Sequence, residues 1–309
     1  MIWALSLLAI LGVTYGGCPP ADSIGPLCTC RDYLDAMMTC RDVLSGEELL
    51  KPFHSVASLK YKIFSLQISN SSFSFLPNSL FDGCSFQKIR FYNSQIMSLS
   101  DSDIAFEGLE DSLEELRATE GHYTAQWDWQ QLRKLRKLQL IDINMIQLGS
   151  VSEPFPPLKS LIALGIMGAG IGYIHPRAFA DLSELIILNL KDNQISSVKR
   201  SMLPSKLSFL DFSNNELSVL PKDLFQNLPH LVHVALGNNR LTALPEDTFQ
   251  WPMQNLESLF LLGNQLVCDC RMRWIKGRRI PIEFYVKCAK PDSLAGKDLR
   301  SVKYQELIC

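Results

Sequence analysis

Apolar and polar positions alternate along the middle of the chain in an arrangement that returns at a nearly constant interval. Its full form reads L-x-x-L-x-L-x-x-N-x-L, and four clear copies begin at Leu185, Leu207, Leu231 and Leu256. Five weaker copies begin at Ile63, Phe86, Leu113, Leu135 and Leu161. Successive copies start 22 to 27 residues apart. This period is typical of a solenoid in which each coil supplies one strand and one irregular or helical return.

The apolar positions inside each copy have the period of two that marks a half-buried strand. One row of side chains then enters the core, and the side chains between them face solvent on a concave surface. The amide position of the motif predicts a ladder bonded to the backbone of the neighbouring coil, formed by Asn193, Asn215, Asn239 and Asn264. The first five copies lack this Asn, so we expect the N-terminal half to be less regular. The residues in its place are Ser71, Ser94, Gly121, Ile143 and Ala169.

Nine cysteines are distributed in a way that predicts a covered solenoid. Four of them, Cys18, Cys28, Cys30 and Cys40, precede the first copy, and four more, Cys268, Cys270, Cys288 and Cys309, follow the last. Two sets of four indicate disulfide-bonded caps in an oxidising compartment, although each set allows three pairings. Cys84 stands alone between the sets. We expect it to be a buried core residue, with a reactive thiol as the alternative.

The N-terminal segment predicts secretion. Residues 2–13 form an apolar stretch that is too short to cross a bilayer, and small residues follow it, so we interpret residues 1–16 as a signal peptide. No later apolar run reaches 18 residues, and we expect no membrane span and no glycolipid anchor. One glycosylation sequon begins at Asn70.

Composition and motifs argue against several classes of function. The net charge of −2 disfavours a general nucleic-acid role. The chain has no metalloprotease, nucleophile-elbow, P-loop or dinucleotide-binding motif, so we expect a protein that is not an enzyme and needs no cofactor. His230 and His233 are the two histidines closest in sequence. The repeat places His233 on the concave side and His230 before the strand, and we expect no metal site there.

The spacing of the cysteines also resembles that of a known protein family. The run Cys268-Asp269-Cys270, followed by Trp274, Cys288 and Cys309, closely resembles the C-terminal cap of extracellular leucine-rich-repeat proteins. The N-terminal set resembles the matching cap. The resemblance implies the pairs Cys18–Cys30, Cys28–Cys40, Cys268–Cys288 and Cys270–Cys309. It also implies an α/β solenoid: a curved horseshoe of about nine repeats over residues 63–267, a parallel concave sheet, and disulfide-bonded caps at residues 17–62 and 268–309.

A narrower resemblance rests on the N-terminal run of Cys18-Pro19-Pro20-Ala21, Ile24 and Cys28-Thr29-Cys30. It is similar to secreted arthropod proteins named after the non-catalytic subunit of luciferin 2-monooxygenase. This implies a secreted, non-catalytic protein-binding scaffold, acting as a partner subunit or as an extracellular recognition protein. The alternative is innate-immune recognition of microbial lipid or carbohydrate. A lipid binder needs an enclosed apolar pocket, whereas this register predicts an open, mixed concave surface.

The positions within each repeat predict which side chains lie on the concave face and can contact a partner. Counting two, four and six places after the first apolar residue of each copy gives a basic cluster of Lys88, Arg90, Arg117 and Lys137. It gives apolar side chains in the middle of the same face, where solvent favours polar ones. An apolar cluster flanked by charge is typical of a protein interface, although scattered exposed apolar residues are also common. The predicted partner-binding residues are Lys137, Met167, Ile187, Phe209 and Asp211.

Two further features have competing interpretations. The C-terminal cap carries ten Lys or Arg against five Asp or Glu, and this basic stretch predicts either polyanion contact or a solvated face. It is densest at Arg271, Arg273, Lys276, Arg278 and Arg279. In the middle of the chain, Trp129 is expected in the core, whereas Trp127 is expected to be the freer of the two.

Overall fold

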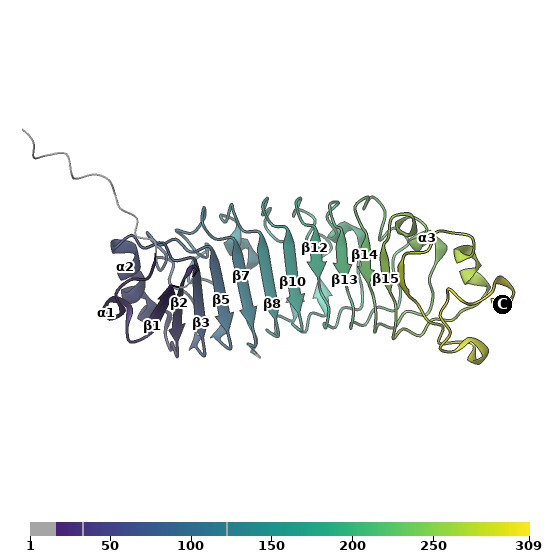
Figure 1. The fold of residues 1–309 in the computed structure, drawn as a ribbon, viewed down its shortest axis with the longest axis horizontal. Coiled ribbons are helices and arrows are strands. Elements are labelled where there is room, and N and C mark those ends of the chain that lie inside the picture. The colour runs from purple at the N-terminus through teal and green to yellow at the C-terminus, as the bar shows by residue number, and fades with distance from the viewer. Residues whose placement is uncertain (1–16, 33, 122) are drawn as a thin grey trace, which may run out of the picture.

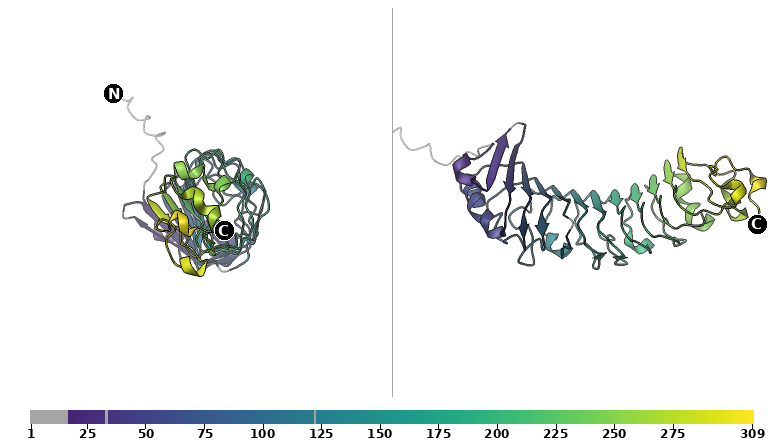
Figure 2. Two further views of the ribbon diagram at one scale, coloured as in Figure 1. Left: turned by 90° about the vertical axis from the view of Figure 1, so that its right-hand side faces the viewer. Right: turned by 90° about the horizontal axis from the view of Figure 1, so that it is seen from below.

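The computed structural model describes residues 17–32, 34–121 and 123–309, so the expected signal peptide lies outside the described residues. The chain forms an elongated solenoid whose coils follow one another from the N-terminal to the C-terminal cap (Figure 1). Seen from below, the coils follow a shallow arc with the strands along its inner side (Figure 2). The predicted curved solenoid with a concave sheet is therefore confirmed.

One sheet of 12 strands runs the length of the molecule, and its order follows the chain. The strands β1 and β2 pair antiparallel, and every later neighbour pairs parallel. The strands are β1 (Cys28–Asp32), β2 (Ala36–Arg41), β3 (Ser65–Ser69), β5 (Lys88–Tyr92), β7 (Glu115–Thr119), β8 (Leu140–Asn144), β10 (Ala163–Met167), β12 (Ile187–Asn189), β13 (Phe209–Asp211), β14 (His233–Ala235), β15 (Ser258–Phe260) and β16 (Glu283–Tyr285).

The returns between these strands are short helical turns or extended segments. The helical ones are α1 (Ala21–Ile24), η1 (Gly46–Leu49), α2 (Leu50–Ser58), η2 (Trp129–Leu132), η3 (Arg200–Met202), α3 (Glu246–Phe249), η4 (Pro252–Gln254), η5 (Cys270–Ile275), η6 (Asp292–Leu294) and η7 (Tyr304–Glu306). Two pairs of short strands lie in the other returns, β4 (Ser72–Phe73) with β6 (Gln95–Ile96) and β9 (Ser150–Val151) with β11 (Tyr173–Ile174).

Aromatic side chains of neighbouring coils pack against one another in the core. Phe225 and Phe249 of neighbouring coils have ring centroids 5.4 Å apart, and Trp129 stacks on Phe155 at 4.6 Å. The expectation that Trp127 is the freer tryptophan is wrong. Its side chain is buried because the indole Nε1 donates a hydrogen bond of 2.9 Å to the carbonyl of Ile96, which satisfies its polar end inside the core.

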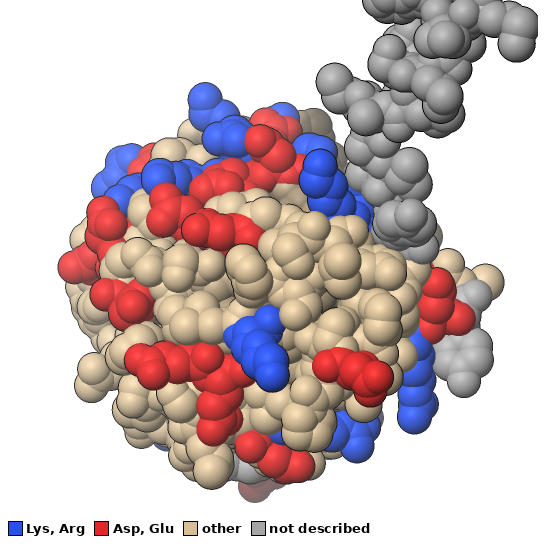
Figure 3. Space-filling view, turned by 90° about the vertical axis from the view of Figure 1, so that its left-hand side faces the viewer, with Lys and Arg blue, Asp and Glu red and all other residues tan. Residues whose placement is uncertain are grey.

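Disulfides close both ends of the solenoid. They join Cys18 to Cys30, Cys28 to Cys40, Cys268 to Cys288 and Cys270 to Cys309, which confirms the pairing that the resemblance implies. Seen from the N-terminal end, charged side chains of both signs are scattered over a largely uncharged surface (Figure 3). The cap thus gives water a mixed surface in place of an open core, which a terminal repeat requires.

The free cysteine Cys84 lies in the core, as expected, and is 7% exposed. Its Sγ lies 3.6 Å from the carbonyl oxygen of Phe53, to which it donates a weak hydrogen bond. Burial, with a smaller contribution from the charge of Asp82, raises the pKa of the thiol to about 12. Cys84 therefore has the environment of an inert core thiol.

The fourth repeat begins three residues later than the sequence suggested, at Leu138. Strand β8 pairs Leu140 with Glu115 on one side and with Ala163 on the other, while Ile141 and Ile143 point into the core. The segment from Leu135 to Leu140 imitates the start of a repeat, but its first leucine ends the preceding return. Lys137 is consequently exposed before the strand and does not lie on the concave face. Its predicted concave position is wrong.

A ladder of buried asparagines joins the C-terminal coils, as the motif predicts. Asn239 illustrates the pattern: its Oδ1 accepts from the amide of Leu217 at 3.0 Å, and its Nδ2 lies within 3.2 Å of the carbonyls of Phe212, Leu236 and Gly237. Asn193, Asn215 and Asn264 make the equivalent bonds.

The N-terminal half is not the less regular half, contrary to our expectation. Strands β3, β5, β7, β8 and β10 have five residues each, whereas β12 to β15 have three. In the C-terminal coils, side chains form hydrogen bonds with backbone carbonyls and amides that would otherwise pair between the strands. The carbonyl of Leu190 accepts from Asn215 Nδ2 at 3.0 Å, and the amide of Ser213 donates to Asp211 Oδ1 at 2.7 Å. These bonds replace one backbone bond between the coils, so the strands end two residues early, and the backbone bonding resumes where the amide of Asp192 donates to the carbonyl of Ser213.

A second regularity lies shortly after each strand. One residue per coil has a left-handed backbone one to three residues after the strand, and in every coil before that of Gly263 its amide donates to a carbonyl of the next coil. This row contains Asp42, Asn70, Asn93, Glu120, Met145, Gly168, Asp192, Asn214, Asn238 and Gly263. Asn and Asp tolerate this conformation best among residues with side chains. At Gly263 glycine is required, since a Cβ would lie 1.8 Å from Asn238 Oδ1.

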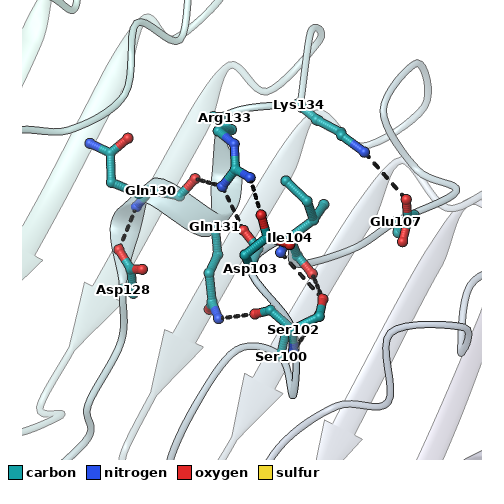
Figure 4. A network of polar contacts seen from close by, with 10 residues as sticks. All are labelled: Ser100, Ser102, Asp103, Ile104, Glu107, Asp128, Gln130, Gln131, Arg133 and Lys134. Carbon is teal, nitrogen blue, oxygen red and sulfur yellow. Dashed lines mark hydrogen bonds and ion pairs between the residues drawn. The ribbon is translucent and has the colours of Figure 1, made fainter.

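A polar network fastens one long return to the coil that follows it (Figure 4). Gln131 is buried and donates from Nε2 to the carbonyl of Ser102 at 2.6 Å. Arg133 reaches the carbonyl of Asp103 at 2.6 Å, and Lys134 pairs with Glu107 at 3.3 Å. The network lies outside the concave strands and has the structural role of anchoring an irregular segment.

Candidate functional site

The concave face is built from the outward residues of the sheet, which line up across successive strands. The row formed by the first residue of each strand runs through Ser65, Lys88, Glu115, Leu140, Ala163, Ile187, Phe209, His233 and Ser258. Its chemistry changes along the molecule, from charged at β5 and β7 to apolar between β8 and β13.

Ion pairs neutralise most of the charged part. Lys88 Nζ lies 2.6 Å from Glu115 Oε1, and Arg117 Nη1 lies 2.9 Å from Asp142 Oδ2. Burial alone would raise the pKa of Glu115, but the neighbouring Lys88 and Arg117 outweigh it and hold that pKa below its usual range. The predicted basic cluster is therefore largely a balanced network within the protein, with Arg90 exposed beside it.

An exposed apolar patch follows on the next strands. We define the apolar patch as Leu140, Ile162, Ile186, Ile187 and Phe209. The three isoleucines are each 40% exposed, and Leu140 and Phe209 are half-buried. The inward residues Leu164 and Leu188 fill the core at these positions, whereas each isoleucine leaves 40% of its surface in water. Their exposure is thus a cost that the fold does not require.

Sequence reasoning missed Ile162 and Ile186. Both lie immediately before their strands, at places that the repeat count did not include. Five other coils carry polar residues there, Gln87, Glu114, Gln139, Ser208 and Glu257, and two carry the apolar residues Phe64 and Val232. The doubled isoleucine at 186 and 187 breaks the expected alternation of polar and apolar residues, and this break was the available signal.

The remaining predicted residues lie around the patch. Phe209 has its ring 6.2 Å from that of His233, whose Nδ1 is 2.7 Å from Ser258 Oγ. Met167 is half-buried at the end of β10. Asp211 follows Phe209 by two residues, and its carboxylate holds the amide of Ser213. The structure thus brings Ile187, Phe209 and Asp211 together and separates them from Lys137.

The sequon at Asn70 lies in the left-handed row beyond β3. Asn70 is exposed, with φ of 51°, and its Oδ1 accepts a hydrogen bond of 2.9 Å from Asn93 Nδ2. Strands β5, β7, β8 and β10 separate this position from Ile187. A glycan at Asn70 remains a prediction and would leave the apolar patch uncovered.

The basic residues of the C-terminal cap are mostly engaged within the protein. Arg271 pairs with Asp269 at 2.6 Å, Arg278 pairs with Glu246 at 3.0 Å, and Arg273 Nε donates to the carbonyl of Leu307 at 2.8 Å. Lys276 Nζ donates to the carbonyl of Leu299 at 2.7 Å. Polyanion contact stays a prediction, and these bonds favour the alternative of a structural, solvated surface.

Two other features of the described residues bear on function. Asp269, Cys270 and Cys309 place ligand-type atoms within 4.8 Å of one another, but the two sulfurs are joined as a disulfide and offer no thiolate to a metal. Among the helices between residues 17 and 309 that the structure describes, none has the length and apolar character to cross a bilayer.

Comparison with known proteins agrees with this geometry. Residues 205–266 match the leucine rich repeat family. A chain from the octameric complex of Latrophilin 3 (Lec, Olf), Unc5D (Ig, Ig2, TSP1) and FLRT2 (LRR) aligns over 91% of this chain and 98% of its own length, with a TM-score of 0.64 and 18% identity. The fold is a leucine-rich-repeat solenoid.

The structure of human 5T4 (Wnt-activated inhibitory factor 1, trophoblast glycoprotein) has the same fold, with a TM-score of 0.56 and 22% identity over 94% of this chain and 100% of its own. Among curated relatives, mouse leucine-rich repeats and immunoglobulin-like domains protein 2 is 30% identical over 102 residues, which is 33% of this chain. Mouse podocan is 35% identical over 63 residues, or 20% of this chain. The matched segments span 10% of the length of each relative.

Proposed function

We propose that this protein is a secreted, non-catalytic scaffold that holds a partner protein against the apolar patch on its concave face. The patch itself carries the proposal, since contiguous apolar side chains that the core does not need are typical of interaction sites. Ile187 is 40% exposed at the start of β12, and Ile162 and Ile186, equally exposed, lie just before β10 and β12. Burying them under a partner would recover the free energy that their hydration costs.

The surroundings of the patch support a protein as the occupant. On one side lies the balanced network of Lys88, Glu115, Arg117 and Asp142, and on the other lies His233. An apolar centre with a polar rim is the usual anatomy of a protein interface. The four disulfides favour an extracellular location, and a structural relative with this fold comes from an octameric protein complex. The role of partner subunit and the role of extracellular recognition protein both fit this surface.

The test begins with affinity capture from native extracellular fluid and identification of the bound protein by mass spectrometry. Titration calorimetry then compares the wild type with the double variant Ile187→Ala/Phe209→Ala. We expect the variant to lose at least about thirtyfold in affinity, because interface anchors of this kind contribute on the order of 2 kcal/mol. Tyr173→Ala, which removes an exposed aromatic side chain from a return, is the matched control. Equal affinities of the wild type and the double variant would show that the patch is not the binding surface.

A further inference from the structure

A second surface feature lies in the returns, away from the concave strands. Three successive coils enclose an open hollow of 660 Å³ between Ser205, the segment 225–229 and the segment 251–255. Its volume lies within the range of roughly 300 to 1,000 Å³ that is usual for small-molecule sites. None of its lining residues belongs to the apolar patch. We call it the Trp251 hollow.

Trp251 forms one wall, and the fold does not explain its presence. The repeat places Asp181 and Asn227 at the corresponding turn of earlier coils, two residues after the core residues Phe179 and Phe225. A polar residue therefore suffices at this turn. Trp251 is 58% exposed, and its indole donates no hydrogen bond to any residue that the structure describes. The floor beside it is apolar and buried, formed by Phe225, Leu228 and Pro252.

The rim of the hollow offers unpaired carboxamides. Gln226, Asn227, Gln254 and Asn255 are exposed, and their side chains form no hydrogen bonds within the part of the chain that the structure describes. Each presents both a donor and an acceptor. The backbone that carries them is nevertheless fixed. Arg200 donates to the carbonyls of Gln226 and Asn227, the latter at 3.1 Å, and Arg279 donates to the carbonyl of Gln254.

Charge limits what such a site can bind. Charged residues make up 20% of the chain, yet none is among the residues lining the hollow. Arg200 and Arg279 lie beside the rim, but their guanidinium groups are engaged by its backbone carbonyls, so the groups that line the hollow favour an uncharged ligand that can both donate and accept hydrogen bonds. A neutral sugar matches both features. The C–H face of its ring packs against the indole, whose π face is negative, and its hydroxyls exchange hydrogen bonds with the carboxamides.

We propose that the Trp251 hollow binds a neutral oligosaccharide. This site is independent of the concave protein-binding surface. Each can fail without the other, because the two share no residue.

The experiment titrates the folded protein with a fixed set of neutral probes: oligomers of glucose, of mannose and of N-acetylglucosamine. Heparin oligosaccharides serve as the charged comparison, and a peptide rich in Pro and Gln serves as the non-sugar comparison. The chain has five tryptophans, so the part of the fluorescence change that Trp251→Phe removes is assigned to Trp251, and calorimetry measures the affinity. We expect one neutral oligomer to bind and to change the fluorescence. Trp251→Ala should then weaken binding at least about tenfold, while Trp251→Phe keeps most of it because an aromatic face remains.

Control variants distinguish binding in the Trp251 hollow from binding elsewhere on the protein and from partial unfolding. Tyr173→Ala should bind the oligomer like the wild type, and Ile187→Ala/Phe209→Ala should also leave sugar binding unchanged. The circular dichroism and melting temperature of Trp251→Ala should match the wild type, since the removed side chain is largely exposed. The proposal is wrong if none of the neutral oligomers binds at concentrations up to about 10 mM, a generous limit for a specific site. It is equally wrong if only heparin or the peptide binds, or if Trp251→Ala leaves the affinity for the oligomer unchanged.

Discussion

Strands β3, β5, β7, β8 and β10 each have five residues, whereas β12 to β15 have three and rely on the buried asparagine ladder beside them. In the first region coils are joined mainly by backbone bonds, assisted by Ser71 and Ser94. In the second region side-chain amides occupy carbonyls that backbone bonds would otherwise use. The same coil geometry is therefore reached with two different sets of hydrogen bonds.

The concave surface divides near the same place. The N-terminal coils present Lys88, Glu115, Arg117 and Asp142, which satisfy one another. The middle coils present the apolar patch, which has no partner within the described residues. A surface whose charges are already paired has little to gain from a new contact, whereas exposed apolar area gains by being covered. We therefore infer that the charged residues of the N-terminal coils stabilise the fold and that the apolar patch of the middle coils contacts a partner.

The largest effect should come from breaking the asparagine ladder. Asn239→Ala removes the acceptor for the amide of Leu217 and leaves the carbonyls of Phe212 and Leu236 without that donor in a buried setting. We expect a loss of about 3 kcal/mol in the free energy of unfolding, measured by urea denaturation. Ser94→Ala, at the same place in an N-terminal coil, should cost only about 1 kcal/mol, because backbone pairing remains. Equal losses would contradict the distinction between the two regions.

A smaller effect is expected from the charged network. The pKa of Glu115 is held below its ordinary value of 4.5, so its ion pairs stabilise the fold above that pH. This contribution is lost as the pH falls through the lowered pKa. Because the network is partly exposed, it should amount to less than about 1 kcal/mol. Glu115→Gln should therefore fall below the wild type in stability at pH 7, and the difference should shrink at pH 3. A variant that is destabilised equally at both pH values would show that the ion pairs are not the cause.

The smallest effect on the fold and on binding is expected at the core thiol of the N-terminal half, where the measured quantity is chemical reactivity. With its pKa raised to about 12, Cys84 should react with a thiol reagent at pH 8 more than about a hundredfold more slowly than a free cysteine. In denaturant it should react at the ordinary rate, and Cys84→Ala should leave partner binding unchanged. Fast labelling of the native protein would place Cys84 at the surface instead.

Much of this architecture could be predicted from the sequence, because a repeat forces the same geometry nine times. The inward leucines, the ladder of Asn193 to Asn264 and the caps follow from spacing or from resemblance. The predicted start of the fourth repeat, Leu135, was wrong by three residues. The alternation of apolar and polar residues alone cannot distinguish the last residue of a return from the first residue of a repeat. Trp127 was misplaced because its carbonyl partner at Ile96 belongs to another coil.

The predicted site was partly correct for a related reason. Ile187 and Phe209 lie on a well-formed repeat, so their position on the concave face follows from the motif. Ile162 and Ile186 lie just before their strands, where the motif assigns no direction to the side chain. The Trp251 hollow combines residues of three coils. Its shape depends on how the returns pack, and no spacing in the sequence specifies that.

The central claim is that the apolar patch serves recognition and not folding. The most direct test compares two adjacent residues of β12, Ile187 at 40% exposure and Leu188 at 0%, by measuring the free energy of unfolding of each alanine variant without any partner. We predict that Leu188→Ala loses about 3 kcal/mol, as buried leucines do, and that Ile187→Ala loses less than about 1 kcal/mol. Equal destabilisation by the two substitutions would mean that Ile187 supports the core, and the patch could then no longer be considered a surface kept for a partner.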